Sequence, residues 1–158
     1  MKGHMLKKIN IGTAPKEVIN ALVTLYHQKK YDDVLSRSSQ LIQKYPNTYS
    51  FYNILGAISY ERGDREDAVK LFEKVIELHP NHPHAYNNLG ATLIDLEEYI
   101  KALEVFERAI EIKPNYAEAY NNVGNVYQKL KKYNLAIENY KKAIELNSDY
   151  YEAYNNMG

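Results

Sequence analysis

The sequence predicts an all-α solenoid of helical hairpins, and two observations carry this prediction. The first is an internal repeat: YNILG at 52–56 returns as YNNLG at 86–90, YNNVG at 120–124 and YNNMG at 154–158, each time 34 residues further on. The second is the apolar pattern inside a repeat, which between 83 and 116 forms two stripes at helical spacing. Each repeat is therefore expected to contain two amphipathic helices.

Turn-forming residues separate these helices. Polar segments at 63–66, 96–99 and 130–133 divide the two helices of a repeat, so each repeat is predicted to be an antiparallel hairpin. Prolines at 46, 80 and 114 mark the ends of successive repeats, because the residue before a proline is pushed out of helical geometry. Asn81 and Asn115 then favour a turn into the next hairpin.

Glycines at a fixed position indicate close packing inside each hairpin. Gly56, Gly90 and Gly124 fall in the middle of the first helices, where a glycine costs up to about 1 kcal/mol relative to alanine. That cost predicts that the two helices of a hairpin approach each other closely at the glycine. We expect Gly90→Leu to overpack this crossing and to destabilise the fold by about 1–3 kcal/mol.

The order of the residues that recur in each repeat resembles the tetratricopeptide repeat: an aromatic residue, Leu-Gly, alanine, a second aromatic residue, alanine and proline. The resemblance implies a right-handed solenoid, in which most of the 16 tyrosines serve packing. It divides the chain into a degenerate capping repeat at 15–48, full repeats at 49–82, 83–116 and 117–150, and the first helix of a truncated further repeat at 151–158. Residues 1–14 form a leader, and its start, MKGHM, is typical of a remnant of cloning.

The C-terminal residues predict an uncovered stacking face. A natural solenoid ends in a helix with a polar outer face, whereas Tyr154 and Met157 belong to a stacking face with no second helix after it. We therefore expect the chain to be a fragment of a longer protein. The same face predicts self-association through the helix at 151–158, because a solenoid end is a surface on which another copy can stack.

The resemblance also implies a binding site. First helices of tetratricopeptide arrays line a concave groove that takes a peptide or a partner segment, so the predicted function is a protein–protein interaction scaffold. Carried over by register, the groove residues are Asn53, His84, Asn87, Asn88, Glu118, Asn121, Asn122, Asn125 and Asn156. A side-chain amide both donates and accepts hydrogen bonds, so a row of asparagines can match an extended backbone. The alternative is that asparagine serves helix packing and solubility at these positions.

Two narrower functions follow from the same positions. Asn88, Asn122 and Asn156 resemble the asparagine ladder of O-linked N-acetylglucosamine transferases, so the alternative function is the substrate-recognition arm of a larger, bacterial glycosyltransferase of that kind. A co-chaperone groove that clamps a terminal carboxylate is disfavoured. It needs cations where this chain has Glu118 and Glu152.

Composition excludes several other classes. The chain has 20 Lys and Arg against 20 Asp and Glu, which removes the attraction that drives nucleic-acid binding. No apolar run is long enough to insert into a membrane, and the absence of cysteine fits a reducing compartment, so we expect a cytoplasmic protein. The sequence contains no phosphate-binding loop or hydrolase motif, and we expect no catalysis and no cofactor.

The run HPNHPH at 79–84 contains three histidines, and imidazole is a common metal ligand. Structural zinc normally needs four ligands in a closed set, and this chain has no cysteine to complete one. His79, His82 and His84 are therefore interpreted as part of the turn between two repeats.

Overall fold

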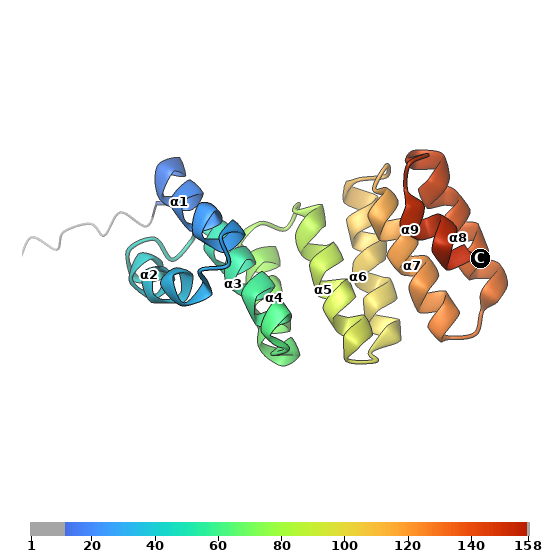
Figure 1. Ribbon diagram of the computed structural model, residues 1–158, viewed down its shortest axis with the longest axis horizontal. Coiled ribbons are helices and arrows are strands. Elements are labelled where there is room, and N and C mark those ends of the chain that lie inside the picture. Colours follow the sequence, from blue (N-terminus) through green and yellow to red (C-terminus); the bar gives the residue numbers. More distant parts are fainter. Residues whose placement is uncertain (1–11, 158) are drawn as a thin grey trace, which may run out of the picture.

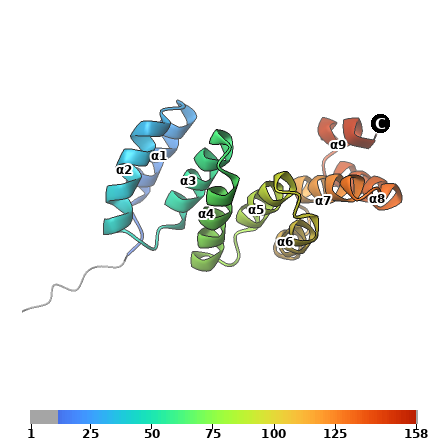
Figure 2. The same ribbon diagram turned by 90° about the horizontal axis from the view of Figure 1, so that it is seen from below.

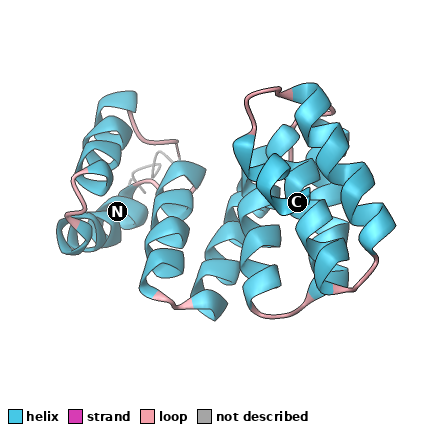
Figure 3. Ribbon diagram, turned by 45° about the vertical axis from the view of Figure 1, so that its right-hand side comes forward, coloured by secondary structure: helices cyan, strands magenta, loops and turns pink. Residues whose placement is uncertain are grey.

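The computed structural model describes residues 12–157, and within this range the chain forms nine helices and no strand (Figures 1 and 3). The helices pack as successive antiparallel hairpins, which confirms the predicted all-α solenoid. The first eleven residues, most of the predicted leader, lie outside the described part. No helix in the described part combines the length and the apolar character needed to cross a membrane.

The helix bounds follow the predicted two-helix pattern. The helices are α1 (Lys16–His27), α2 (Tyr31–Lys44), α3 (Tyr49–Arg62), α4 (Arg65–Leu78), α5 (Pro83–Asp95), α6 (Tyr99–Ile112), α7 (Ala117–Lys129), α8 (Tyr133–Leu146) and α9 (Tyr151–Met157). The turns inside the hairpins are shorter than predicted, because Arg65, Tyr99 and Tyr133 already begin the second helices.

A left-handed backbone conformation ends four of the first helices at one register position. The residues with positive φ are Lys29 (57°), Gly63 (90°), Glu97 (60°) and Lys131 (59°). Only one of the four is glycine, so the turn geometry is imposed by the packing of the hairpin and not by glycine alone. At the ends of α4 and α6 the residue before proline is extended, as the sequence predicts, with φ of −143° at His79 and −133° at Lys113.

The glycine crossings are confirmed. A Cβ atom added at Gly56, Gly90 or Gly124 would lie 2.7, 2.6 or 2.4 Å from the nearest ring carbon of an aromatic side chain on the following helix. That side chain is Phe72 for Gly56, Phe106 for Gly90 and Tyr140 for Gly124. The aromatic ring therefore packs directly against glycine backbone, which is the close approach that the mid-helix glycines predict.

The repeat at 49–82 contributes its two helices to two different hydrophobic clusters. Phe51, Ile54 and Ile58 of α3 pack in a cluster with residues of α1 and α2, among them Leu22. Phe72 of α4 instead belongs to a cluster that continues through α5, α6 and α7. The two helices of this repeat therefore serve two different parts of the core.

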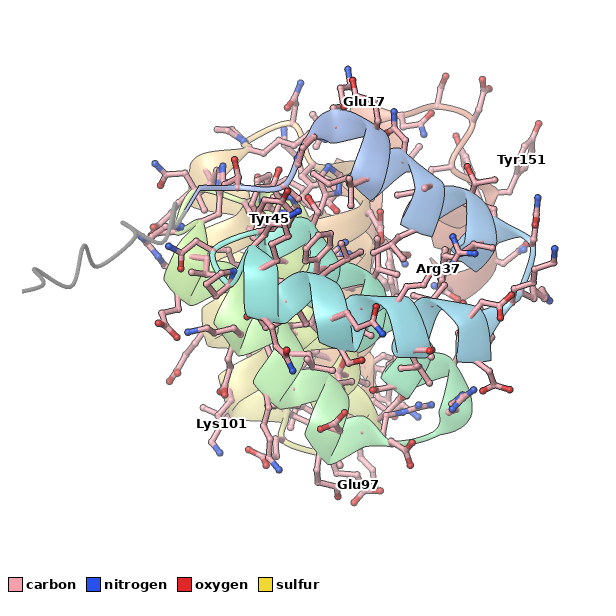
Figure 4. All side chains as sticks on the ribbon, turned by 90° about the vertical axis from the view of Figure 1, so that its left-hand side faces the viewer. Glu17, Arg37, Tyr45, Glu97, Lys101 and Tyr151 are labelled. Carbon is pink, nitrogen blue, oxygen red and sulfur yellow. The ribbon has the colours of Figure 1, made fainter. Side chains whose placement is uncertain are left out.

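The hairpins follow an arc, which Figure 2 shows with α1 and α9 on its two arms and α4 to α6 along its lower part. The odd-numbered helices are the first helices of the hairpins and lie toward the open side of this arc, which we call the inner face (Figure 2). At the C-terminal end the structure exposes large apolar side chains: Tyr151 is 74% exposed and Tyr154 is 46% exposed. Figure 4 looks along the array from the N-terminal end and shows Tyr151 extending outward at the far end.

Candidate functional site

All nine predicted groove residues lie on odd-numbered helices. Asn53 is on α3; His84, Asn87 and Asn88 are on α5; Glu118, Asn121, Asn122 and Asn125 are on α7; and Asn156 is on α9. Their exposure differs sharply, since Asn87 is 2% exposed and Asn121 is 0% exposed. The others are half-buried or exposed. The structure thus separates these residues into a buried row and an accessible row.

Side-chain amides join neighbouring repeats. The Nδ2 of Asn122 donates to Oδ1 of Asn87 over 3.0 Å, and the Nδ2 of Asn156 donates to Oδ1 of Asn121 over 3.1 Å. Each bond links residues 35 positions apart, so the second asparagine of one YNN string reaches back to the first asparagine of the preceding string. These amides hold the stack of first helices together.

Three further hydrogen bonds consolidate this row. The Nδ2 of Asn87 donates to Oε1 of Glu118 over 2.7 Å. Oδ1 of Asn125 accepts hydrogen bonds from the hydroxyl of Tyr140 over 2.9 Å and from Nδ2 of Asn156 over 3.1 Å. The side chain of Asn125 therefore occupies this position on the inner face and is hydrogen-bonded there.

The amide row is interrupted between α3 and α5. Among the described residues, Oδ1 of Asn53 is buried without a hydrogen-bond partner, and the side chain of Asn88 forms no hydrogen bond. By the register of the other pairs, Asn88 would donate to Asn53. The structure leaves this bond unmade, so the Asn88 amide is available to a ligand, whereas Oδ1 of Asn53 is shielded.

A recess of about 270 Å³ opens at the same place. Its lining comes mainly from the first helices of three hairpins: Tyr26, Ala57, Tyr60, Glu61, Phe72, Asn88 and Ala91. Sequence reasoning did not identify Tyr26, Glu61 or Phe72 as groove residues. The available signal was the side-chain size at one register position, where Ala57 and Ala91 are followed by Asn125.

The carboxylate of Glu61 is held at the edge of the recess. The hydroxyl of Tyr26 donates to Oε1 of Glu61 over 2.6 Å, and the hydroxyl of Tyr31 donates to Oε2. The hydrogen bonds from Tyr26 and Tyr31 lower the pKa of Glu61, burial opposes them, and Lys29 adds to the lowering. Glu61 therefore stays ionised at neutral pH and ties α1 and α2 to α3.

An ion pair spans the next junction on the rim. Nε of Arg65 lies 2.7 Å from Oδ2 of Asp95, joining α4 to α5. The guanidinium carbon of Arg65 also lies 4.0 Å from the centroid of the Tyr60 ring. The Tyr60 ring therefore contacts one cation, the Arg65 guanidinium, because the quadrupole of an aromatic ring attracts positive charge.

The predicted histidine turn forms a row of rings. The ring of Tyr49 lies 4.8 Å from His79 and 5.2 Å from His82, and the rings of His82 and His84 are 5.9 Å apart. Nδ1 of His84 lies 2.7 Å from the Tyr116 hydroxyl. Across residues 12–157, no group of three His, Cys, Asp or Glu side chains is arranged to hold a metal ion.

His82 has a structural role at the start of α5. Its Nδ1 accepts a hydrogen bond from the backbone N–H of Ala85 over 3.1 Å, which caps the helix. Burial lowers the pKa of His82, and the nearby His79 and His84 lower it further. The fold therefore favours the neutral imidazole, which is the form that can accept the capping hydrogen bond.

Helical hairpins stacked with a common inner face define a repeat protein of the interaction-scaffold class. Tetratricopeptide-repeat profiles match residues 49–82, 71–104, 92–131 and 117–150. The chain is built of tetratricopeptide repeats. No characterised protein matches the chain significantly by sequence.

Solved structures agree with this assignment. MamA from Desulfovibrio magneticus RS-1 superposes with a TM-score of 0.79 at 25% identity, over 90% of this chain and 80% of that one. A second MamA crystal structure gives a TM-score of 0.77 at 25% identity, over 85% and 78% of the two chains. The first tetratricopeptide domain of Spaghetti (RPAP3), bound to the HSP90 peptide SRMEEVD, gives 0.67 at 21% identity, over 69% and 86%.

Proposed function

We propose that this chain is a non-enzymatic scaffold that binds an extended segment of a partner protein along its inner face. The observation that carries the proposal is the recess lined mainly by α1, α3 and α5, where the side-chain amide of Asn88 forms no hydrogen bond within the described part of the chain. A peptide backbone that pairs with this amide gains a hydrogen bond and therefore affinity. The expected cytoplasmic location and the absence of a cofactor belong to this proposal.

The chemistry of Asn88 suits a peptide backbone. An extended chain presents alternating N–H and C=O groups, and one side-chain amide can pair with both kinds. A neighbour with the same fold binds a peptide, which supports a peptide as the type of ligand. That neighbour is 21% identical to this chain, so its particular peptide carries no weight here.

The predicted groove disfavours an acidic C-terminal peptide. At the register position of His84, the following repeats carry Glu118 and Glu152. A carboxylate ligand would meet these carboxylates and Glu61 on the same helices, and like charges repel at close range. We therefore keep the co-chaperone type of groove out of the proposal.

The glycosyltransferase arm remains the second candidate, because Asn88, Asn122 and Asn156 do lie at one register position on neighbouring first helices. In this structure Asn122 and Asn156 are bonded to the preceding repeat, and Asn88 is the member with a free amide. A substrate-binding ladder would have to use the remaining hydrogen-bonding atoms of the bonded amides. This favours the scaffold as the primary proposal.

Peptide selection tests the proposal. Random peptides displayed on phage would be selected on the full chain, and the affinities of enriched sequences measured by fluorescence polarisation. We expect Asn88→Ala to weaken binding by about 1 kcal/mol, roughly fivefold, because one hydrogen bond to the backbone is lost. The matched control is Glu107→Ala on the exposed face of α6, which should leave affinity unchanged.

The opposite pattern would contradict the proposed groove. If Glu107→Ala weakened binding and Asn88→Ala did not, the binding site would lie on the outer face of the arc.

Self-association through 151–158 is proposed separately, on the exposure of Tyr151 and Tyr154. Sedimentation velocity of the full chain over a range of concentrations tests it. We expect a concentration-dependent dimer that Tyr151→Ser combined with Tyr154→Ser removes. A monomer at every concentration up to the millimolar range would exclude this interface.

A further inference from the structure

We propose that the recess between α1, α3 and α5 is a receptor site for one cationic side chain, lysine or arginine, of the bound partner segment. The inference rests on the proposed function, since it names the part of a partner segment that the recess recognises. It depends on the shape, the aromatic lining and the charge of the recess.

The shape of the recess admits a long, narrow side chain. Ala57 and Ala91 are small residues that line the recess. At the equivalent position of the next repeat the larger Asn125 stands, and its side chain is hydrogen-bonded. Asn88 is the amide in the lining, and its side chain is not held by a hydrogen bond to a neighbouring helix. The resulting volume of about 270 Å³ is large enough for the extended side chain of lysine or arginine.

The aromatic lining suits the stem and the head of such a side chain. Tyr26, Tyr60 and Phe72 contribute rings to the recess. The methylene groups of lysine and arginine pack on apolar surface while the charged end stays near polar groups. Aromatic rings also attract cations, and the position of Arg65 beside Tyr60 shows that a ring of this recess already does so.

The charge of the recess selects a cation. Glu61 is the charged residue among those that line it, and its carboxylate accepts two phenolic hydrogen bonds from Tyr26 and Tyr31. An ionised carboxylate has about four acceptor positions in all, so Glu61 can accept from an ammonium or guanidinium group as well.

The other charges nearby leave this selection intact. Asp95 is paired with Arg65, and Asp32 is paired with Arg62 over 2.7 Å. Lys29 acts on Glu61 from the turn between α1 and α2 and does not line the recess.

The free amide of Asn88 positions the backbone of the same segment. Asn88 lines the recess, and its side chain forms no hydrogen bond within the described residues. A segment that pairs its backbone with this amide and inserts its next side chain into the recess would use both features. An acidic side chain at that position would face Glu61 and lose affinity.

Four matched peptides test the proposal. Each would be an acetylated and amidated alanine–serine peptide with one central residue, either lysine, arginine, norleucine or glutamate. They would be titrated to millimolar concentration into the ¹⁵N-labelled full chain. We expect the lysine and arginine peptides to shift the NMR signals of Ala57, Glu61, Ala91 and the Asn88 side-chain amide. Norleucine, which has the stem without the charge, should bind about five- to tenfold more weakly.

Two variants separate charge from shape. Glu61→Gln should reduce the affinity of the lysine peptide toward that of the norleucine peptide, whereas Glu107→Gln should leave it unchanged. Because Glu61 also ties α1 and α2 to α3, the folding of the variant is checked by circular dichroism. If Glu61→Gln fails to fold, Ala91→Leu, which fills the recess, takes its place and should abolish the shifts of every peptide.

The outcomes distinguish this site from the general function. Equal affinity for lysine and norleucine peptides, or shifts spread over exposed carboxylates such as Glu107, would overturn the cation site while leaving the groove as a peptide-binding surface. The absence of shifts with all four peptides would also overturn it. Peptide selection with the Asn88→Ala variant judges the proposed function independently of that result.

Discussion

The junction between α5 and α7 is closed by amides, whereas the junction between α3 and α5 is open on the same face. In the closed junction Asn122 donates to Asn87, and Asn87 donates to Glu118. In the open junction Asn88 and Asn53 do not meet, and a recess lies beside them. Both junctions have the same 34-residue register, so the register alone does not determine what the inner face offers to a ligand.

Two of the substitutions that separate the two junctions lie on the rim. Arg65 begins α4 where Tyr99 begins α6, and Asp95 stands where the next repeat has Lys129. The open junction therefore gains an ion pair on its rim and keeps a gap in its amide row. The two junctions therefore differ in the hydrogen bonding of the second asparagine of the string, which is bonded at Asn122 and free at Asn88.

The largest expected effect concerns α5, the helix that the two junctions share. Gly90→Leu should destabilise the fold by about 3 kcal/mol, because even a Cβ atom would lie 2.6 Å from the ring of Phe106. Urea unfolding measures this. Gly63→Lys is the control and should cost about 1 kcal/mol, since Lys29 and Lys131 adopt the same positive φ at equivalent positions. Equal losses for the two variants would mean that the crossing tolerates bulk.

The next effect distinguishes the junctions directly. Asn122→Ala should cost about 1–2 kcal/mol, because it leaves the buried Oδ1 of Asn87 without that donor. Asn88→Ala, at the same register position, should change the free energy of unfolding by less than about 0.5 kcal/mol. Thermal and urea unfolding of the pair provide the measurement, and equal losses would show that both junctions are closed in solution.

A smaller effect is expected on the rim of the open junction. Arg65→Met should cost about 0.5–1 kcal/mol, because the Arg65 and Asp95 side chains are only 27% and 36% exposed and the guanidinium also packs on Tyr60. Arg108→Met is the control. Its pair with Glu111 is 56% and 59% exposed, so the loss should be close to zero. A larger loss at Arg108 would argue against the rim contact.

The smallest effect is a dependence on pH. The folded state lowers the pKa of His82 through burial and through His79 and His84, so the unfolded state binds more protons. The contribution of His82 to stability is therefore complete above the unfolded pKa of about 6.5 and is lost as the pH falls below it. His82→Asn, which can still cap α5, should have a flatter profile of unfolding free energy between pH 7 and 5. An identical slope for both proteins would exclude His82 as the cause.

The fold was largely predictable from the sequence, and the reason is repetition. The YNN strings, the mid-helix glycines and the prolines each recur in register, so several weak signals point to one hairpin. The helices begin earlier than the sequence predicts, at Arg65, Tyr99 and Tyr133, because the residue before each of them already accepts a helical hydrogen bond through its carbonyl oxygen. Helix ends depend on local backbone geometry that residue type describes poorly.

The candidate site was predictable in part. Register placed Asn53, Asn88 and Asn122 on first helices, yet it could not show that Asn122 is bonded to Asn87 while Asn88 is free. That difference depends on the spacing of neighbouring helices, to which side chains of both repeats contribute. Tyr26 and Glu61 reach the recess from different hairpins, 35 positions apart, and no local pattern connects them. Whether the nine predicted residues bind a partner remains a prediction.

The short reach of the contacts between repeats has a consequence for how the chain folds. The hydrogen bonds described between neighbouring first helices join residues 31 to 35 positions apart. Each repeat can therefore dock as soon as its own residues and those of the preceding repeat have left the ribosome, without waiting for distant sequence. Such an array can also unravel from one end, one hairpin at a time, while the interior repeats keep their structure.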